Sequence, residues 1–296
     1  MYFRTRGEKI FNVINYIFIS IVCIACALPI VHILALSLSA PQYVSAGHVG
    51  LWPMGFTTAA YEFAFENPRF LQAFWVSVQR VVLGVGINMF LLITVSYPLA
   101  KTTREFSARN YYTAFFAITM IFGGGLIPFY ILISDIGWLD NILSLVVPGG
   151  LPVFSMIILM NFIRGLPKEL EEAAMLDGAG YIRVLILVLL PVLKPALATV
   201  ALFSFVHHWN EWLLGMMFMN SPDNYPLQTF LQTLLTNFRD LIRQMGPRFA
   251  ETIAARLNER TGRAAQLFLG MLPILAIYPF LQKYFTKGLV IGSVKG

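Results

Sequence analysis

Residues 165–191 read GLPKELEEAAMLDGAGYIRVLILVLLP, and this stretch separates two strongly apolar segments of the chain. Pro167 suits the first turn of a helix, where its missing N–H is no loss, and three glutamates follow where the helix dipole favours negative charge. Gly178 and Gly180 then allow the backbone to reverse. The stretch predicts a short, stiff helix, a turn and a second helix, with Ala173 and Ala174 exposed on the first helix.

The composition of the whole chain is that of a membrane protein. Of its 296 residues, 57% are hydrophobic and only 12% are charged, whereas charged residues make up about a quarter of soluble domains. A bilayer core about 30 Å thick takes about 20 apolar residues per helix. The predicted fold class is therefore an all-α membrane protein with six transmembrane helices. These are predicted at Phe11–Leu36, Phe74–Leu99, Tyr111–Ile133, Ile142–Ile163, Pro191–Leu214 and Ala264–Leu281.

Glycine and proline interrupt the last four of these stretches. The interruptions are Gly123–Gly125, Pro148–Pro152, Pro195, and Pro273 with Pro279. A membrane helix tolerates such a break when neighbouring groups or a cavity satisfy the freed backbone. The broken helices therefore indicate a pathway through the membrane.

Basic residues in the short loops set the predicted orientation, because Lys and Arg concentrate on the cytoplasmic side. With the N-terminus inside, the basic clusters at residues 4–9, 101–109, 164–183 and 283–295 share one side. The short loop opposite, Ser134–Asp140, has aspartates but no Lys or Arg. Both termini are predicted to be cytoplasmic. The same clusters account for much of the formal charge of +6, so a nucleic-acid partner is not required.

The chain offers few groups for chemistry of its own. No G-x-x-x-x-G-K-[ST] motif occurs, so any energy must come from a partner. Cys23 and Cys26 lie inside the first apolar stretch and are interpreted as packing residues. His207 and Glu211 share a helix face, but two ligands with His208 beside them fall short of a catalytic zinc site. We predict no catalytic, metal or cofactor site, and the alternative is an intramembrane metalloenzyme that uses these three residues.

The stretch at 165–191 carries a resemblance to a known family. The spacing of Glu172-Ala173-Ala174, Gly178 and Leu190-Pro191 resembles the cytoplasmic loop of binding-protein-dependent ABC importer permeases, with Val188 in place of the usual isoleucine. Taken alone, these residues would fit an ordinary capped connector between two membrane helices equally well.

Other parts of the chain carry the same resemblance. The runs at 122–141, 209–212 and 225–228 resemble the carbohydrate importer permeases, and the end from Tyr278 is similar to the terminus of the maltose importer's smaller permease. The resemblance covers nearly the whole chain. Within this family, the chain is similar to the smaller permease of an alginate oligosaccharide importer.

The resemblance implies a type I ABC importer permease fold in the bacterial inner membrane, and a permease subunit rather than an enzyme. The implied partners are a second, different permease, two ATPase subunits that carry ATP and Mg, a periplasmic solute-binding protein and an oligosaccharide. The implied organisation is a cytoplasmic tail (1–10), a first transmembrane helix (11–36), a periplasmic loop (37–69), a permease core of five transmembrane helices (70–288) and a cytoplasmic tail (289–296). The core includes a coupling loop (165–190) and a second periplasmic loop (215–263).

Three sets of site residues follow from the resemblance and from the residues themselves. The expected ATPase-coupling residues are Glu171, Glu172, Ala173, Ala174, Asp177 and Gly178. The tail residues expected to contact the ATPase are Ser293, Val294, Lys295 and Gly296. The candidate translocation cavity consists of Gly124, Asn161, Asn210 and Glu211, because polar groups at membrane depth line a pathway or pair with one another. For Arg80 in the second predicted span, the structural alternative is snorkelling to the outer surface.

The second external loop bears on the substrate. It carries Arg239, Arg243, Arg248, Arg256, Arg260 and Arg263 against Asp240, Glu251 and Glu259. A solvated helix is the ordinary interpretation, but a basic lip would concentrate an anionic sugar near the entrance. We therefore predict an importer of oligosaccharides, with acidic, alginate-like ones as a hypothesis. The alternative is a permease for another solute, such as peptides or amino acids.

Overall fold

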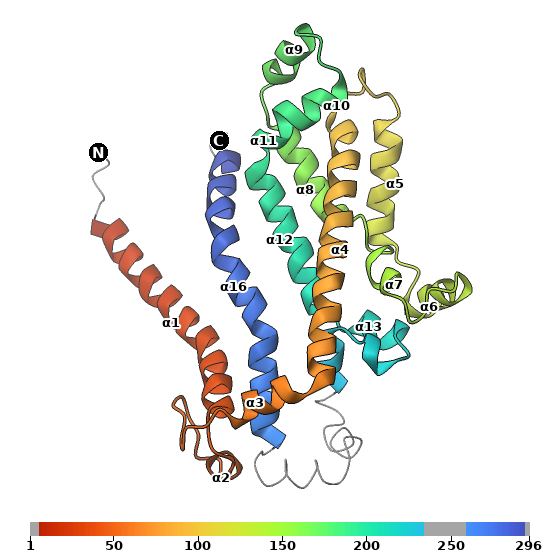
Figure 1. The fold of residues 1–296 in the computed structure, drawn as a ribbon. Helices are drawn as coiled ribbons and strands as arrows, with labels where there is room; N and C mark the ends of the chain where they lie inside the picture. Colours follow the sequence, from red (N-terminus) through yellow and green to blue (C-terminus); the bar gives the residue numbers. More distant parts are fainter. Residues whose placement is uncertain (1–5, 234–258, 294–296) are drawn as a thin grey trace. The chain divides into compact units, whose positions relative to one another are not determined.

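The structure is a computed structural model, and it describes residues 6–233 and 259–293. Helices dominate it, and these residues contain no β-strand (Figure 1). The predicted all-α fold class is thus confirmed. By its internal contacts the chain forms two compact units, Met1–Pro68 with Leu231–Leu272, and Arg69–Phe230 with Pro273–Gly296.

The first unit contains the N-terminal helix α1 (Arg6–Ser37), the short helices α2 (Pro41–Ser45) and α3 (Ala59–Glu66), and the beginning of α16 (Glu259–Ser293). The most apolar window of α1 has none of its side chains buried. At the end of α1, Ser37 Oγ lies 2.7 Å from Tyr61 Oη on α3. This bond fastens α3 to α1, and the predicted first span lies within one continuous helix.

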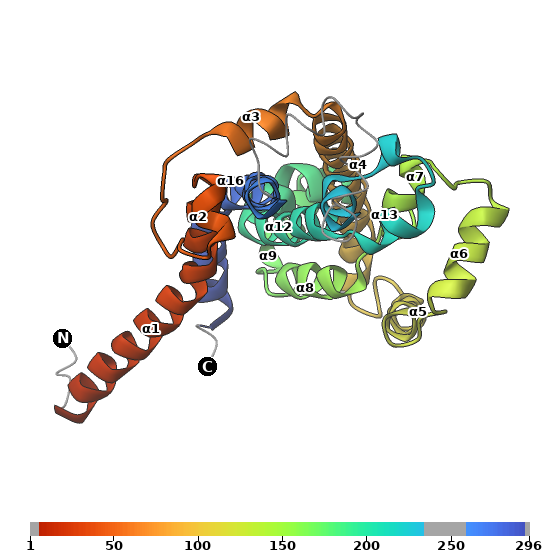
Figure 2. The same cartoon turned by 90° about the horizontal axis from the view of Figure 1, so that it is seen from below.

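The second unit contains the longest run of membrane-like helices. Its elements are α4 (Pro68–Ala100), α5 (Arg109–Ile121), α6 (Leu126–Asp135), α7 (Ile142–Val146), α8 (Val153–Arg164), α9 (Glu169–Leu176), α10 (Tyr181–Arg183), the π-helical turn η1 (Val184–Leu189), α11 (Leu190–Val192), α12 (Lys194–Asn210), α13 (Leu213–Phe218) and the 3₁₀ turn η2 (Pro222–Asn224). Residues 227–233 are also helical. Helices α8 and α12 lie side by side, and α6 lies at the margin of the unit (Figures 1 and 2).

The helices that could cross a membrane differ from the six predicted spans. Within the described ranges, α1 and α4 are long and apolar enough, and the number rises to four if each of two bent pairs counts as one span. The pair α5 and α6 is bent by 112°, and the stretch Tyr181–Val192 meets α12 at 84°. Helix α8 is apolar but shorter. The count of six and the cytoplasmic termini stay predictions.

Three of the four predicted interruptions coincide with breaks between helices. They are the α5–α6 link, the link between α7 and α8, and the junction of α11 and α12. The fourth prediction is wrong, because α16 continues through both Pro273 and Pro279. A proline removes one backbone donor, but in a membrane helix neighbouring groups and local adjustments re-satisfy the backbone, so the helix need not end.

The core of the second unit is apolar, with one buried polar cluster. Helices α4, α8 and α12 contribute fully buried Leu92, Met156 and Val200 to a single apolar cluster. Because lipid tails are as apolar as these side chains, close van der Waals packing and interhelical hydrogen bonds, rather than removal of apolar surface from water, hold such helices together. Beside it lies the polar side chain of Asn88 on α4, which is 1% exposed.

Asn88 satisfies the backbone at the break between α7 and α8. Its Nδ2 donates to the carbonyl oxygens of Gly149 (2.9 Å) and Gly150 (2.7 Å). Its Oδ1 accepts hydrogen bonds from Ser204 Oγ and from His208 Nε2, the latter at 2.9 Å. Since the amide nitrogen is already the donor to two carbonyls, the oxygen must accept and the His208 proton lies on Nε2. One side chain therefore joins α4, α12 and the broken segment.

Asp140 joins two loops in the same unit. Its backbone has a positive φ of 60°, and its Oδ1 accepts hydrogen bonds from the N–H groups of Asn220 and Ser221, each at 3.1 Å. Burial raises the pKa of this carboxyl, but the hydrogen bonds from Asn224, Ser221 and Asn220 outweigh it and hold the pKa below its ordinary value. The link before α7 is thereby fixed to the segment after α13.

The first prediction concerns Gly84, which faces His208. A Cβ at Gly84 would lie 2.4 Å from His208 Nε2, whereas a Cβ at Gly86 on the same helix meets nothing within 4 Å. We expect Gly84→Ala to lower the free energy of unfolding by about 1–3 kcal/mol through overpacking. Gly86→Ala should leave it unchanged or raise it by about 0.5–1 kcal/mol. Thermal unfolding of the purified protein in detergent measures both, and equal midpoints would contradict the assignment.

Candidate functional site

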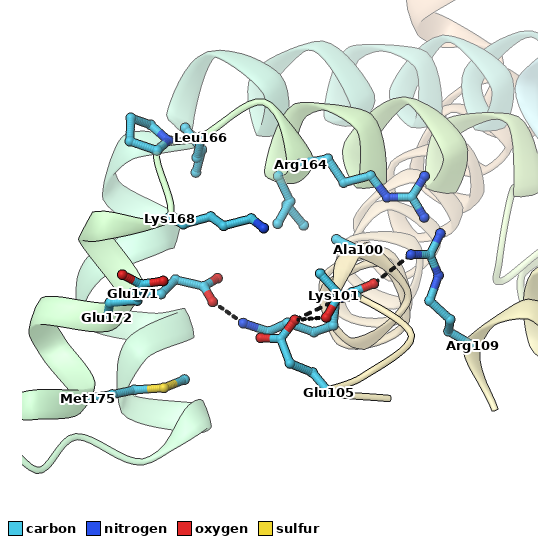
Figure 3. Close-up of a pocket in the computed structure, with 13 residues that line it drawn as sticks. Ala100, Lys101, Glu105, Arg109, Arg164, Leu166, Lys168, Glu171, Glu172 and Met175 are labelled. Atoms are coloured by element: carbon cyan, nitrogen blue, oxygen red, sulfur yellow. Dashed lines mark hydrogen bonds and ion pairs between the residues drawn. The ribbon is translucent and has the colours of Figure 1, made fainter. Parts of the chain in front are cut away.

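A pocket of about 360 Å³ lies where the end of α4 meets α8 and α9 (Figure 3). Charged side chains dominate its lining. The cations are Lys101, Arg109, Arg164 and Lys168, and the carboxylates are Glu105, Glu171 and Glu172. The pocket therefore gathers residues of the predicted coupling loop together with basic residues from the end of α4, the loop that follows it and the start of α5.

Helix α9 forms within the predicted stretch, but it begins at Glu169 with Lys168 as its cap, so Pro167 lies before the helix rather than in its first turn. Acidic residues occupy its first turn, where they oppose the positive end of the helix dipole. After the helix ends, Gly178 adopts a φ of +82°, and its N–H donates to the Met175 carbonyl at 3.0 Å. The next amide, of Ala179, donates to the Ala174 carbonyl at 3.0 Å. A positive φ is costly for residues with a Cβ, so glycine is the residue that this turn favours.

The two faces of α9 differ in what they contact. Ala174, which the sequence analysis expects to be exposed, is instead half-buried and packs with Met175 against the apolar cluster of α4, α8 and α12. Helix α9 also lies against η1. Glu171, with 19% of its side chain exposed, points towards Lys101 across the pocket (Figure 3). This inward face holds α9 to its own chain.

The outward face carries most of the residues expected to couple to an ATPase. Glu172, Ala173, Asp177 and Gly178 are all exposed. Leu176 is 90% exposed and stands on the same helix. Leu176 is not among the site residues predicted from the sequence, where the available signal is an apolar side chain directly before Asp177 and Gly178.

Lys101, directly after α4, is the second residue that the sequence analysis left out of the site. Its ammonium forms an ion pair with Glu171, and its side chain is only 9% exposed. It also lies 4.5 Å from the centre of the Tyr97 ring and 5.6 Å from that of Tyr181. Burial is the largest single influence and lowers the pKa of Lys101, but the hydrogen bonds to Glu171 and Tyr97 and the charge of Glu171 together outweigh it, so the pKa lies above its ordinary value.

Two arginines cap the end of α4 beside this lysine. Arg109 Nη1 donates to the carbonyl of Lys101 at 2.8 Å, and Arg164 Nη2 donates to the carbonyl of Leu99 at 2.9 Å. The last carbonyls of a helix lack partners within it and carry partial negative charge. The two guanidinium groups therefore stabilise the end of α4, and they lie next to each other in Figure 3.

Glu211 of the predicted cavity forms a buried ion pair. Its Oε2 lies 2.6 Å from Nη2 of Arg80, a side chain with no exposed surface, and its backbone carbonyl accepts from Nη1 at 2.8 Å. Its Oε1 accepts the N–H of Leu214 at 2.7 Å, at the start of α13. Arg80 thus does not snorkel to the surface. The pair joins α4 to the link between α12 and α13.

The other three predicted cavity residues are exposed and lie apart along the chain. Gly124 lies in the α5–α6 link, Asn161 on α8, and Asn210 is the last residue of α12. The pocket at α9 includes none of the three. Their role in a pathway stays a prediction.

The metalloenzyme alternative loses its ligands to other partners. His208 bonds to Asn88, and Glu211 to Arg80. Within residues 6–233 and 259–293, no group of three or more His, Cys, Asp or Glu side chains could hold a metal ion. His207 is exposed at the end of α12.

Some predicted residues fall where side chains are not described. Of the C-terminal tail, Ser293 is the last residue of α16, and Val294, Lys295 and Gly296 lie outside the described residues. In the second external loop, Arg239, Arg243, Arg248 and Arg256 also lie outside them, whereas Arg260 and Arg263 lie in α16.

Known proteins match this chain over nearly its full length. The family described as "Binding-protein-dependent transport system inner membrane component" matches residues 1–291. Protein LplC of Bacillus subtilis (strain 168) is 36% identical over 99% of this chain and 97% of its own length. The polygalacturonan/rhamnogalacturonan transport system permease protein YtcP of the same organism is 30% identical, over 98% of this chain and 99% of its own.

A solved structure shares the fold. It is the crystal structure of a bacterial ABC transporter involved in the import of the acidic polysaccharide alginate. One of its chains is 27% identical to this chain and superposes with a TM-score of 0.85. The match covers 96% of this chain and 100% of that chain.

The second prediction separates the structural role of Glu211 from a role in the pathway. Glu211→Ala leaves the charge of buried Arg80 without its partner, and we expect this to cost about 3–5 kcal/mol of stability. Asn210→Ala, at an exposed position beside it, should change stability by less than about 0.5 kcal/mol. Thermal unfolding in detergent measures both. A Glu211→Ala variant as stable as Asn210→Ala would show that the ion pair does not hold the α12–α13 junction.

Proposed function

Because the chain belongs to the family of binding-protein-dependent transport system inner membrane components, we propose that it is the permease subunit of an ATP-driven importer of oligosaccharides. It is a transport component of the bacterial inner membrane rather than an enzyme. In this proposal the chain binds no cofactor, and ATP and Mg belong to two separate ATPase subunits. A second, different permease and an external binding protein complete the importer.

The observation that carries the proposal is the exposed face of α9. It presents Glu172, Ala173 and Leu176 on a short helix that is fixed to its own chain by the opposite face. Small side chains allow close approach of another backbone, and a carboxylate forms a charge-assisted pair with a partner's Arg or Lys. The large exposed leucine fits an apolar pocket on that partner. We infer that this face docks on an ATPase subunit.

The exposed apolar faces of α5 and α6 support the proposal of a second permease as partner. Helix α5 has no buried residue among those described, and α6 has only Ile133. Apolar helices with so few buried side chains contact either lipid or another membrane helix. We infer that the second permease covers one such face, with the translocation cavity, including Gly124, Asn161 and Asn210, between the two subunits.

The proposed mechanism is alternating access. Closure of the ATPase subunits on ATP would displace α9, and the membrane helices beyond it would switch the cavity from inward-facing to outward-facing. In the second unit, α16 ends towards the same end as α9 to α11 (Figure 1). This placement supports the proposal that the tail from Ser293 to Gly296 contacts an ATPase subunit. It also supports the proposal that α9 and this tail lie in the cytoplasm.

The proposed substrate is an acidic oligosaccharide. YtcP is named for polygalacturonan and rhamnogalacturonan, and the similar solved structure is named for alginate, an acidic polysaccharide. The excess of arginine in the second external loop, which includes Arg260 and Arg263, is compatible with a carboxylate-bearing sugar. Both names favour sugars over the alternative of peptides or amino acids.

The third prediction tests docking of α9. We expect the Glu172→Arg variant to lose co-purification with the ATPase subunit. The change replaces a carboxylate at the proposed interface by a positive charge, which would repel the partner's Arg or Lys. The loss should be about 2–5 kcal/mol in binding free energy. Glu169→Arg, at an exposed position in the first turn of the same helix, is the control and should retain the ATPase. Full retention by Glu172→Arg would count against the docking assignment.

The fourth prediction tests the substrate class. The reconstituted importer, with its binding protein, should hydrolyse ATP faster when given uronate oligosaccharides than when given neutral oligosaccharides of equal length. Each arm is measured as the ATPase rate over the rate without sugar. Equal stimulation by both classes would exclude the acidic preference and leave the assignment as an oligosaccharide permease intact.

A further inference from the structure

Three elements meet around the ammonium group of Lys101. Tyr97 lies on α4, Glu171 on α9 and Tyr181 on α10, and Lys101 contacts all three. Lysine is almost never buried to 9% exposure unless it is paired. An ammonium close to two aromatic rings gains a further electrostatic attraction to their faces. The charge is therefore held in one place rather than left to move in solvent.

The contact between α9 and the end of α4 is narrow. Lys101 lines the charged pocket of about 360 Å³ and also a second, more apolar pocket of about 400 Å³ that includes Thr94, Tyr97 and Ile182. Open space thus lies on two sides of the lysine. Among the described residues, α9 forms one ion pair, which joins Glu171 to Lys101. The two elements are joined here by a polar link rather than by an extended packed surface.

Lys101 is not required to cap the helix it follows. Arg109 and Arg164 already donate to the carbonyls of Lys101 and Leu99. The lysine side chain is therefore free to serve the contact with Glu171. Its raised pKa agrees with a charged form that the site stabilises despite burial.

The other end of this link is a rigid helix. Helix α4 runs without interruption from Pro68 to Ala100, and its Asn88 is bonded to α12 and to the break before α8. An α-helix does not lengthen without breaking its backbone hydrogen bonds. A displacement of α9 that pulls on Lys101 would therefore reach the segments that Asn88 joins.

We propose that Lys101 is a positioning residue for coupling, which fastens α9 to α4 through Glu171 so that movement of α9 is transmitted to the membrane helices. This inference rests on the proposed function. It assigns Glu171 to the inner link rather than to the ATPase surface, where Glu172 and Leu176 stand.

The test uses the complete importer, with both permeases, the ATPase subunits and the binding protein, in proteoliposomes. The variants are Lys101→Met, Glu171→Met, the double variant and Lys101→Arg. Co-purification of the ATPase, the ATPase rate without binding protein, and the rate with substrate-loaded binding protein are measured for each. Lys168→Met is the control, because Lys168 lines the same pocket beside α9.

For Lys101→Met and Glu171→Met, the complex should assemble with an unchanged basal rate, and stimulation by the loaded binding protein should fall about tenfold, within the usual range of coupling between sites. The double variant should fall no further than either single one, since both act through one link. Lys101→Arg, which keeps the charge and the ring contacts, should retain at least half of the stimulation, and Lys168→Met all of it.

Three outcomes would overturn the inference. They are unchanged stimulation in both single variants, additive losses in the double variant, or a loss of assembly, which would assign the pair to folding alone. Failure of the proposed function would look different. In that case the unaltered chain would neither retain an ATPase nor show any stimulation by a loaded binding protein.

Discussion

The second unit depends on the rule that a backbone group inside a membrane must find its hydrogen-bond partner within the protein. Residues between α7 and α8 leave the helix and expose carbonyls at Gly149 and Gly150, and Asn88 satisfies both. The same amide then accepts from Ser204 and His208 on α12, so its hydrogen bonds tie both α12 and the link before α8 to α4. Gly84 follows from this arrangement, because the His208 ring occupies the space that a Cβ would need.

The local chemistry of α9 could be predicted from the sequence, since its determinants are adjacent in the chain. The glutamates of the first turn complement the dipole of one short helix, and Gly178 makes the turn that follows it, whereas Pro167 lies before the helix and not in its first turn. The breaks at Gly123–Gly125 and Pro148–Pro152 were predictable for the same reason. The effect of a proline within α16 was not, because whether a helix continues past proline depends on neighbours that the local sequence does not name.

Pairing between residues far apart in the chain could not be predicted from the sequence either. Arg80 and Glu211 are 131 residues apart, and each alone fits several interpretations, such as snorkelling, a pathway or a pair. Only their placement shows that they neutralise each other at the α12–α13 junction. Lys101 was read as a marker of the cytoplasmic side, and the exposure of Leu176 is set by how α9 sits on its core. The helical period predicts a face, but not which face is turned inward.

The basic residues at the end of α4 divide their work according to their chemistry. Arg109 and Arg164 present planar, multiply donating groups, and they bond to backbone carbonyls that have fixed positions. Lys101 has a compact charge on a flexible stem, and it bonds to a carboxylate on another helix. The arginines therefore stabilise the end of α4, whereas the lysine joins it to α9. Because Ala174 and Met175 also pack against the apolar core and α9 lies against η1, the helix is attached to its own chain by an apolar contact as well as by the ion pair. A displacement of α9 would therefore reach α4 through the ion pair and the apolar core through Ala174 and Met175.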